Sequence, residues 1–435
     1  MSFGFFTHNI DLNGANPCTW IPPDPDVDII AEAIYTDTST THTESGYVFG
    51  ALTGIGTSVL CHVSGRRVVT CPDATIETPI FTVHDNALPL DLWYLANGTS
   101  DYLQITSFQR FNGEWYCHMN GVDTNGTNRV NDNAYVGHTS DGYNWTVQTW
   151  TYRDGNDVPR AGRGNLNGRY TQRAMIWEGD VDNQRLVSDG LWQADKRKPT
   201  YPAGTVFSDL TVASYSAWIG GSPVWDNLSD WGSWHENQSA LALLPLASGG
   251  YFRARMGPVG SWMRADYINY DLDTVRTVGG TVNWLNGNTP KTNMVVAEDT
   301  VLIARNDSTV YVWDSSLSGT AEMPYVDLLK YSATGNSFQR NEWNGVHWMV
   351  GSFFSSSTTL YTNFTTDEHP TALTAGPNVI LPSTHTGNLT HRFTCNIRHL
   401  TDNIWIGHYR DTSFRTVIFR FTYGTYTGDC VWPEE

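Results

Sequence analysis

Short runs rich in β-branched and aromatic residues recur from residue 46 to residue 424 of this chain. Examples are Ser58–Val63, Arg67–Thr70 and Thr309–Trp313, each next to turn-forming residues. Runs of this kind, closed by turn residues, predict β-strands. Residues 28–35 fit a short helix and a strand equally well. Helical spacing is otherwise nearly absent, so the pattern predicts an all-β protein.

The turn dipeptides indicate how these strands are connected. The chain has eight Asn-Gly and three Asp-Gly pairs. Both central residues of a type I′ turn have positive φ, which Asn or Asp followed by Gly tolerates best. Antiparallel hairpins are therefore the expected connection. A βαβ dinucleotide-binding or P-loop fold is excluded, and no Gly-rich phosphate motif occurs.

A turn that leads into an aromatic or aliphatic strand repeats along the chain. Copies stand at Asn112-Gly113, Glu298-Asp299, Asn344-Gly345 and Asp402-Asn403. The spacing of the last three is close to the length of one four-stranded propeller blade. We therefore predict an antiparallel β-propeller over residues 31–435, with six to eight four-stranded blades and seven favoured. Residues 1–30 are rich in proline and predict an extended N-terminal arm, with a strand that could complete the last blade.

A second repeated motif supports the propeller. Residues 139–146 read Thr-Ser-Asp-Gly-Tyr-Asn-Trp-Thr, and a degraded copy begins at residue 187. In such a turn the Asp side chain accepts backbone N–H groups, the Gly supplies an unusual φ, and the Trp fills space beside the next strand. The residues that we assign to this structural role are Ser140, Asp141, Gly142, Trp145, Ser188, Asp189, Gly190 and Trp192.

This motif resembles the Asp-box of sialidase-like propellers. The usual Asp-box has one more residue between Asp and Gly, so the compact form here is more similar to propeller repeats of bacteriophage tail and fibre proteins. The resemblance implies a propeller fold and a virion or tail role. A sialidase-like activity would need three arginines that converge on the substrate carboxylate, and no such set can be assigned among the arginines of this chain.

Charge and composition narrow the range of partners. The formal net charge is −18, and the only dense basic cluster is Lys196-Arg197-Lys198. Nucleic acid is therefore a poor candidate partner, because phosphate binding needs clustered cations. The longest apolar stretch, Ala240–Ala247, is far shorter than the roughly 20 residues of a membrane span. Met1–Leu12 lacks the features of a secretory signal. A signal that was removed, another route of export and an intracellular location are all compatible with this sequence.

The six cysteines do not decide the compartment. They show no C-x-x-C spacing, so the sequence predicts neither a cysteine zinc site nor a thioredoxin-like redox site. Cys61 and Cys71 flank a turn and could face each other across a hairpin. Cys18 and Cys430 could bridge the ends of the chain. We expect most of the six to be buried free thiols, since free cysteine behaves as a small hydrophobe.

No metal site, cofactor or catalytic residue is predicted. The histidines include no H-E-x-x-H motif, and Glu368-His369 is an isolated pair of neighbours. Burial beside Trp can raise a carboxyl pKa. However, tryptophan is common here, so we expect a structural role for the glutamates that stand near Trp, namely Glu114, Glu178, Glu236 and Glu342.

Binding residues are better supported than catalytic ones. Trp225, Trp231, Trp234 and His235 lie in a turn-rich segment with Asp and Asn. Such rings can stack on sugars while the polar groups meet hydroxyls, although the same tryptophans could fill gaps between blades. Arg160 and Arg163 belong to a basic loop that could meet an anionic glycan or simply be solvated.

These observations favour a structural protein of a virion or phage tail that presents a β-propeller to a glycan or protein on the host surface. The arm would dock to neighbouring virion or tail subunits. The expected location is the virion, assembled in the host cytoplasm, with an extracellular protein as the alternative. Two other hypotheses stay open. One is a glycan-processing hydrolase, sialidase-like or another propeller glycosidase, with paired carboxylates at the propeller axis. The other is a free, acidic, β-rich secreted scaffold.

Overall fold

The computed structural model contains 31 strands and no helix in the residues that it describes. Of these residues, none forms a helix that could cross a membrane. The chain divides into two compact units. Unit 1 comprises Met1–Ala87, Lys291–Trp313 and Pro324–Glu435, and unit 2 comprises Leu88–Pro290 and Asp314–Met323. The described residues are 18–38, 52–64, 67–85, 87, 102–111, 114–122, 134–149, 151–153, 159–161, 175–178, 185–188, 239–248, 251–256, 262–268, 274–283, 293–304, 309–314, 325–330, 337–354, 357–384, 396–413, 415–430 and 432.

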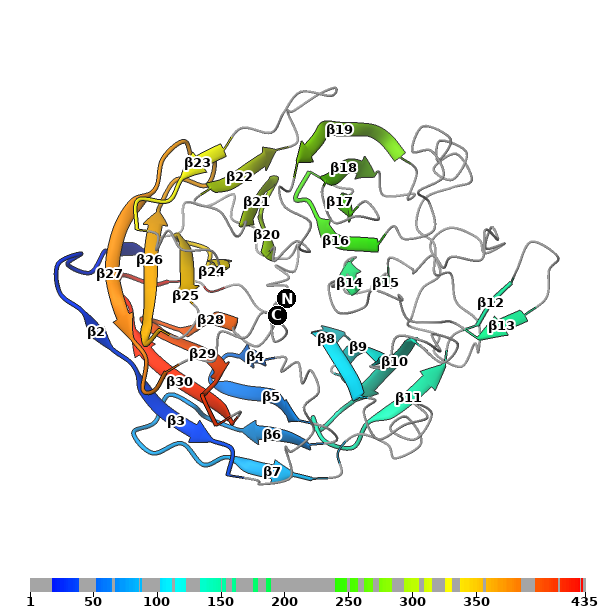
Figure 1. Cartoon of the computed structure of the whole chain (residues 1–435), viewed down its shortest axis with the longest axis horizontal. Helices are drawn as coiled ribbons and strands as arrows, with labels where there is room; N and C mark the ends of the chain where they lie inside the picture. The colour runs from blue at the N-terminus through cyan, green and yellow to red at the C-terminus, as the bar shows by residue number, and fades with distance from the viewer. Residues whose placement is uncertain are drawn as a thin grey trace. The chain divides into compact units, whose positions relative to one another are not determined.

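The described part of unit 1 contains four larger sheets, in which most strands pair antiparallel with the next strand in sequence (Figure 1). The first sheet has β4 (Leu52–Ile55), β5 (Ser58–Ser64), β6 (Arg67–Cys71) and β7 (Thr82–His84). The second has β20 (Asn293–Ala297), β21 (Thr300–Ala304), β22 (Thr309–Asp314) and β23 (Tyr325–Asp327). The third has β24 (Ser337–Trp343), β25 (Trp348–Phe354), β26 (Thr359–Thr365) and β27 (Thr374–Ile380). The fourth has β28 (Asn396–Thr401), β29 (Ile404–Arg410), β30 (Thr416–Thr422) and β3 (Glu32–Thr36).

Unit 2 repeats this arrangement. One sheet has β8 (Tyr102–Phe111), β9 (Glu114–Val122), β10 (Ala134–Thr139) and β11 (Thr146–Thr149). Another has β16 (Ser239–Pro245), β17 (Tyr251–Met256), β18 (Trp262–Ile268) and β19 (Thr274–Asn283). Two hairpins complete the described part, β12 (Thr151–Arg153) with β13 (Pro159–Ala161), and β14 (Met175–Glu178) with β15 (Arg185–Ser188).

The three repeated turns that lie within the described residues each join the first two strands of a sheet. Glu298-Asp299 joins β20 to β21 and Asp402-Asn403 joins β28 to β29, with positive φ at Glu298 (48°) and Asp402 (47°). The Asn344-Gly345 turn differs from the expected two-residue hairpin. Trp343 pairs with Trp348, so the loop there has four residues. The repeat is therefore structural, since each copy starts a new sheet.

The first strands of the unit 1 sheets lie beside one another in the order β20, β24, β28 and β4 (Figure 1). Successive sheets thus pack through their first strands, as propeller blades do. The prediction of an all-β protein with antiparallel, mostly four-stranded sheets is confirmed. A closed ring and the number of blades stay predictions.

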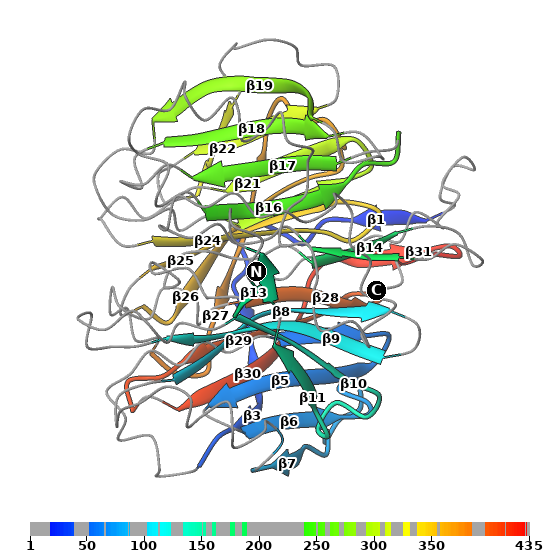
Figure 2. The ribbon, with the colours of Figure 1, turned by 90° about the vertical axis from the view of Figure 1, so that its right-hand side faces the viewer.

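The N-terminal strands pair with strands from the C-terminal part of unit 1. β3 forms the fourth strand of the β28–β30 sheet, and β2 (Ile29–Ile30) adds a parallel strand beside β27. β1 (Thr19–Ile21) pairs with β31 (Thr425–Thr427), and Figure 2 shows these two strands side by side. Residues 28–35 are therefore strands rather than a helix. The described part of the predicted arm, residues 18–30, contains β1 and β2, which both pair with strands of the same chain.

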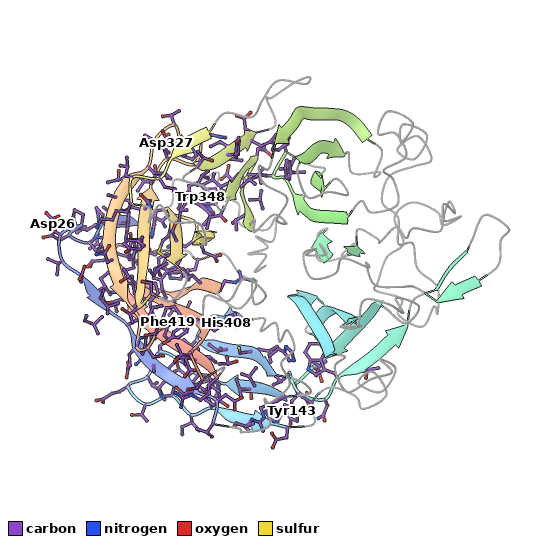
Figure 3. All side chains as sticks on the ribbon, viewed as in Figure 1. Asp26, Tyr143, Asp327, Trp348, His408 and Phe419 are labelled. Carbon is purple, nitrogen blue, oxygen red and sulfur yellow. A yellow bond between two sulfur atoms is a disulfide. The ribbon has the colours of Figure 1, made fainter. Side chains whose placement is uncertain are left out.

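Large aromatic side chains dominate the core of unit 1. Trp313, Trp348, Trp405, Tyr409 and Tyr423 are fully buried. Figure 3 shows the side chains of unit 1 and labels Trp348 on β25 and Phe419 on β30. Buried aromatic side chains of this size each remove a large apolar area from water and so contribute strongly to the stability of the core.

Two cysteine predictions have different outcomes. Cys61 and Cys71 are buried free thiols, as expected. They do not face each other across the hairpin, because Cys61 pairs with Val69 and Cys71 with Val59. Cys18 and Cys430 form a disulfide across 412 residues of sequence. The bridge between the ends of the chain is therefore present.

Candidate functional site

The turn at residues 139–146 has the hydrogen bonds expected from its residue types. The Asp141 carboxylate accepts from the backbone N–H of Tyr143 at 3.0 Å and of Asn144 at 2.8 Å. Gly142 has a φ of 84°, and the buried Trp145 donates from Nε1 to the Gly142 carbonyl at 3.1 Å. Partial burial alone would raise the pKa of Asp141, but these hydrogen bonds outweigh it and lower the pKa to about 2. Asp141 therefore stabilises the turn as an anion.

We expect the Asp141→Ala substitution to lower the free energy of unfolding by about 1 kcal/mol, because two backbone donors lose their acceptor, as at a helix cap. Chemical denaturation monitored by fluorescence measures this change. The control is Ser140→Ala. Ser140 was assigned to the structural role of this turn, but it is exposed, and the hydroxyl that bonds to Asp141 and Gly142 is that of Thr139. Replacement of Ser140 should therefore change stability by less than about 0.5 kcal/mol. Equal effects of the two substitutions would contradict the assigned role of Asp141.

The structure places the other predicted site residues as follows. Ser188 is the last residue of β15 and pairs with Met175. Arg160 lies in β13 opposite Tyr152, so this part of the predicted basic loop is a strand. The residues that lie outside the described part of the chain are Asp189, Gly190, Trp192, Trp225, Trp231, Trp234, His235 and Arg163.

A different set of polar and aromatic residues comes together in unit 1. Its centre is the four-residue loop between β24 and β25. The Asn344 side-chain oxygen accepts from the backbone N–H of Val346 at 3.1 Å and of His347 at 2.9 Å. The Asn344 amide nitrogen donates to the Tyr426 hydroxyl at 2.6 Å. Asn344 therefore shapes the loop and joins it to β31.

His347 lies at the centre of a cluster of rings that we call the terminal aromatic cluster. Its imidazole stacks on Trp20 with ring centroids 3.7 Å apart and planes 5° apart. Its Nδ1 is 3.1 Å from the Tyr426 hydroxyl. The other members of the cluster are His399, Trp405, Tyr423 and Trp432. The cluster thus joins β1, the β24–β25 loop, the β28–β30 sheet and the C-terminal segment.

Both histidines of the cluster are held in the neutral form. Burial lowers the pKa of His347 well below its ordinary value, and the nearby His399 lowers it further. Burial also lowers the pKa of His399 to about 4, although its hydrogen bond to the Asp402 carbonyl acts in the opposite direction. The neutral form of these imidazoles is favoured among the aromatic rings, because a charged imidazole buried here would lose its hydration.

These pKa shifts predict a loss of stability in mild acid. A histidine whose pKa is lowered by folding contributes fully above the pKa of the unfolded chain, near 6.5. The contribution falls as the pH decreases below that value, by at most about 1.4 kcal/mol per pH unit for each histidine. Urea unfolding between pH 7 and pH 4.5 measures the decrease.

Carboxylates also titrate in that range, so the pH test compares variants. His347→Gln should show a shallower loss of stability toward acid than the wild type. Identical slopes for the wild type and His347→Gln would rule out the assigned effect.

A buried ion pair joins two neighbouring sheets of unit 1. Arg398 Nη1 on β28 lies 3.5 Å from Glu342 Oε1 on β24, and both side chains are less than 10% exposed. Glu342 is one of the glutamates that we singled out because it stands next to a tryptophan. Its carboxylate faces a guanidinium, so the structural role expected for it agrees with its geometry.

Glu368 is a carboxyl group whose pKa is raised. From the sequence we described it only as an isolated neighbour of His369. Half-burial raises the pKa of Glu368 to about 6, and the negative charges of Glu298, Asp299 and Asp367 add to the effect. Glu368 and Asp367 follow β26, whereas Glu298 and Asp299 form the β20–β21 turn. Only tertiary structure brings these segments together, and no local pattern marks them. Within the described residues, no three potential ligands form a metal site.

No protein family model and no curated protein matches this chain. Among solved structures, it is similar to the computationally designed Ika8 protein with a TM-score of 0.40 and 10% identity over 90% of this chain and 99% of that one. A mutant of Trypanosoma rangeli sialidase displaying trans-sialidase activity has a TM-score of 0.40 and 8% identity over 94% of this chain and 59% of that one. A post-proline cleaving enzyme from Rickettsia typhi has a TM-score of 0.41 and 6% identity over 88% and 54%. The chain thus spans a little over half the length of these two enzymes. Similarity at this level carries no argument about activity.

Proposed function

We propose that this protein is a structural component of a virion or tail that holds a propeller-type platform for binding to a host surface. The observation that carries the proposal is that residues 18–36 are joined to the C-terminal part of unit 1. β3 completes the C-terminal sheet, β1 pairs with β31, and the Cys18–Cys430 disulfide closes the chain covalently. Disulfides persist in oxidising surroundings such as particle surfaces, so this closure suits a protein that keeps its shape outside a cell.

Buried ionisable groups in the core of unit 1 support a structural role for this protein. Glu342 is neutralised by Arg398, and His347 is buried in its neutral form. These groups stabilise contacts between sheets. The same reasoning makes recognition, rather than turnover, the favoured activity.

Recognition would come from loops that extend from the sheets, since binding residues concentrate on loops held by a rigid scaffold. The tryptophan-rich segment at residues 225–235 is the candidate for contact with a glycan or protein on the host surface. Residues 1–17 are the candidate for contact with neighbouring subunits, because residues 18–30 already pair within the chain.

Mass spectrometry of particles purified on a density gradient tests the proposal. We expect peptides of this chain to follow the major structural protein of the particle at a constant ratio across the gradient. Immunogold labelling of intact particles should place the chain at one end or at the surface. Absence of the chain from every particle fraction would overturn the proposal.

A glycan-processing hydrolase is the second candidate, and Glu368 is the observation that favours it. A carboxyl group with a pKa of about 6 can act as a general acid near neutral pH. This candidate requires turnover of aryl glycosides, including sialosides, by the full chain. Glu368→Gln should abolish the turnover, and Asp367→Asn, which changes a neighbouring carboxylate, should retain most of it. Absence of turnover by the wild type on the whole panel would exclude the hydrolase.

A further inference from the structure

Two described segments that are far apart in the sequence, residues 18–21 and 424–430, form a small element that we call the terminal strap. Its strands, β1 and β31, pair through three residue pairs, from Thr19 with Thr427 to Ile21 with Thr425. They form a two-stranded sheet of their own and do not belong to the β28–β30 sheet. An isolated two-stranded pair of this length is marginal in water, so the strap needs further support.

Trp20 provides part of that support. Its side chain is 7% exposed and contacts His347, Phe364 and Tyr423 through ring packing. Within the strap, Gly424 lies so close to Ile21 that a Cβ on Gly424 would be 2.8 Å from the Ile21 carbonyl oxygen. Gly424 also has a φ of 73°, which side-chain-bearing residues rarely adopt. The closed strap therefore depends on tight local packing.

Closing the strap also has a polar cost. His347 is fully buried, and among the described residues its Nε2 has no hydrogen-bond partner. The same holds for Nε1 of Trp20. Buried polar groups without hydrogen-bond partners oppose the closed state, because each would be hydrated if the strap were open. Packing of Trp20 and the desolvation of these two nitrogens thus act against each other.

We propose that the Cys18–Cys430 disulfide is a redox-dependent lock on this strap, and that its reduction opens the strap and exposes His347 while the sheets of unit 1 stay folded. The sheets do not need the strap for their own pairing, since β3 closes the β28–β30 sheet by itself. The inference shares the Cys18–Cys430 disulfide with the proposed function, but its test measures only the strap and His347, so either can fail without the other.

The chemistry of the lock is thiol–disulfide exchange. One thiolate of a dithiol reductant attacks a sulfur of the Cys18–Cys430 bridge, forming a mixed disulfide and releasing the other cysteine as a thiolate. The second thiol of the reductant then displaces the remaining cysteine. The protein gains two electrons and two protons, and the reductant becomes a cyclic disulfide. A small-molecule disulfide such as oxidised glutathione reverses the reaction.

Acylation of histidines in the full-length protein tests the lock. The oxidised protein and the protein treated with dithiothreitol are exposed to diethylpyrocarbonate, and the modified residues are located by mass spectrometry. The gain of two hydrogen atoms in the intact mass verifies reduction. We expect His347 to be protected in the oxidised protein and modified at least about tenfold faster after reduction, as for a local opening. His369 is exposed and should react at the same rate in both states.

Hydrogen exchange then distinguishes a local opening from general unfolding. After reduction, exchange should accelerate in β1 and β31 and stay unchanged in β29 and β30. A Cys18→Ser/Cys430→Ser variant should show the open pattern with and without reductant, and unlike the wild type should not respond to it. The proposal fails if His347 stays protected after verified reduction. It also fails if exchange accelerates throughout unit 1, or if reductant changes the double variant as much as the wild type.

Discussion

Replacement of Arg398 by methionine should lower the free energy of unfolding by about 3–5 kcal/mol, because the buried carboxylate of Glu342 loses its ion pair with Arg398. Desolvation would then raise the pKa of Glu342 and favour its protonated form. Equilibrium denaturation of the purified chain at pH 7 measures the loss. Part of the stability should return at lower pH, where Glu342 can bind a proton.

The matched control for Arg398→Met removes both charges. In the double variant Glu342→Gln/Arg398→Met neither charge of this pair remains, so its loss should be clearly smaller than that of Arg398→Met alone. If the two variants lose the same stability, the single substitution acts through lost packing, and the ion pair does not hold the two sheets together.

The second large effect is expected at Trp20. Its replacement by alanine should lower the free energy of unfolding of unit 1 by about 3–5 kcal/mol, since a buried indole leaves a cavity beside the His347 ring. Differential scanning calorimetry with denaturant titration measures this change. The same variant should expose His347, so acylation of that histidine is an independent readout.

Ile21 provides the control for Trp20, because it is the next residue of β1 and is 53% exposed. Ile21→Ala should change stability by less than about 0.5 kcal/mol. A loss at Ile21 as large as the loss at Trp20 would show that pairing of β1 with β31, rather than ring packing, stabilises the strap.

These two substitutions probe the feature on which the proposed function depends. Arg398 and Glu342 join neighbouring sheets, and Trp20 joins the N-terminal strand to the C-terminal part of the chain. A platform that displays binding loops needs both kinds of contact, because loop positions follow the scaffold beneath them. The proposed function therefore predicts that any binding to a host surface weakens in these variants together with their stability.

Local patterns predicted the strands and many of the turns. Alternation and β-branched residues marked β5, β6 and β22, since these properties are encoded within a few neighbouring residues. The hydrogen bonds of Asp141 were likewise predictable, because donor and acceptor lie within three residues. The Asn344 turn was mispredicted as a two-residue hairpin. Its amide caps a longer loop, and the dipeptide alone does not reveal this.

Local residue patterns were enough to specify antiparallel β-sheets in repeated units, because hairpins are encoded by neighbouring residues. They did not specify which distant segments meet in the folded chain. The pairing of β3 with β30, the Cys18–Cys430 bridge and the burial of His347 beneath Trp20 each join residues that are hundreds of positions apart. The raised pKa of Glu368 has the same origin, since burial and neighbouring charges come from other loops. Such contacts depend on how sheets pack, and no local pattern of residues specifies that packing.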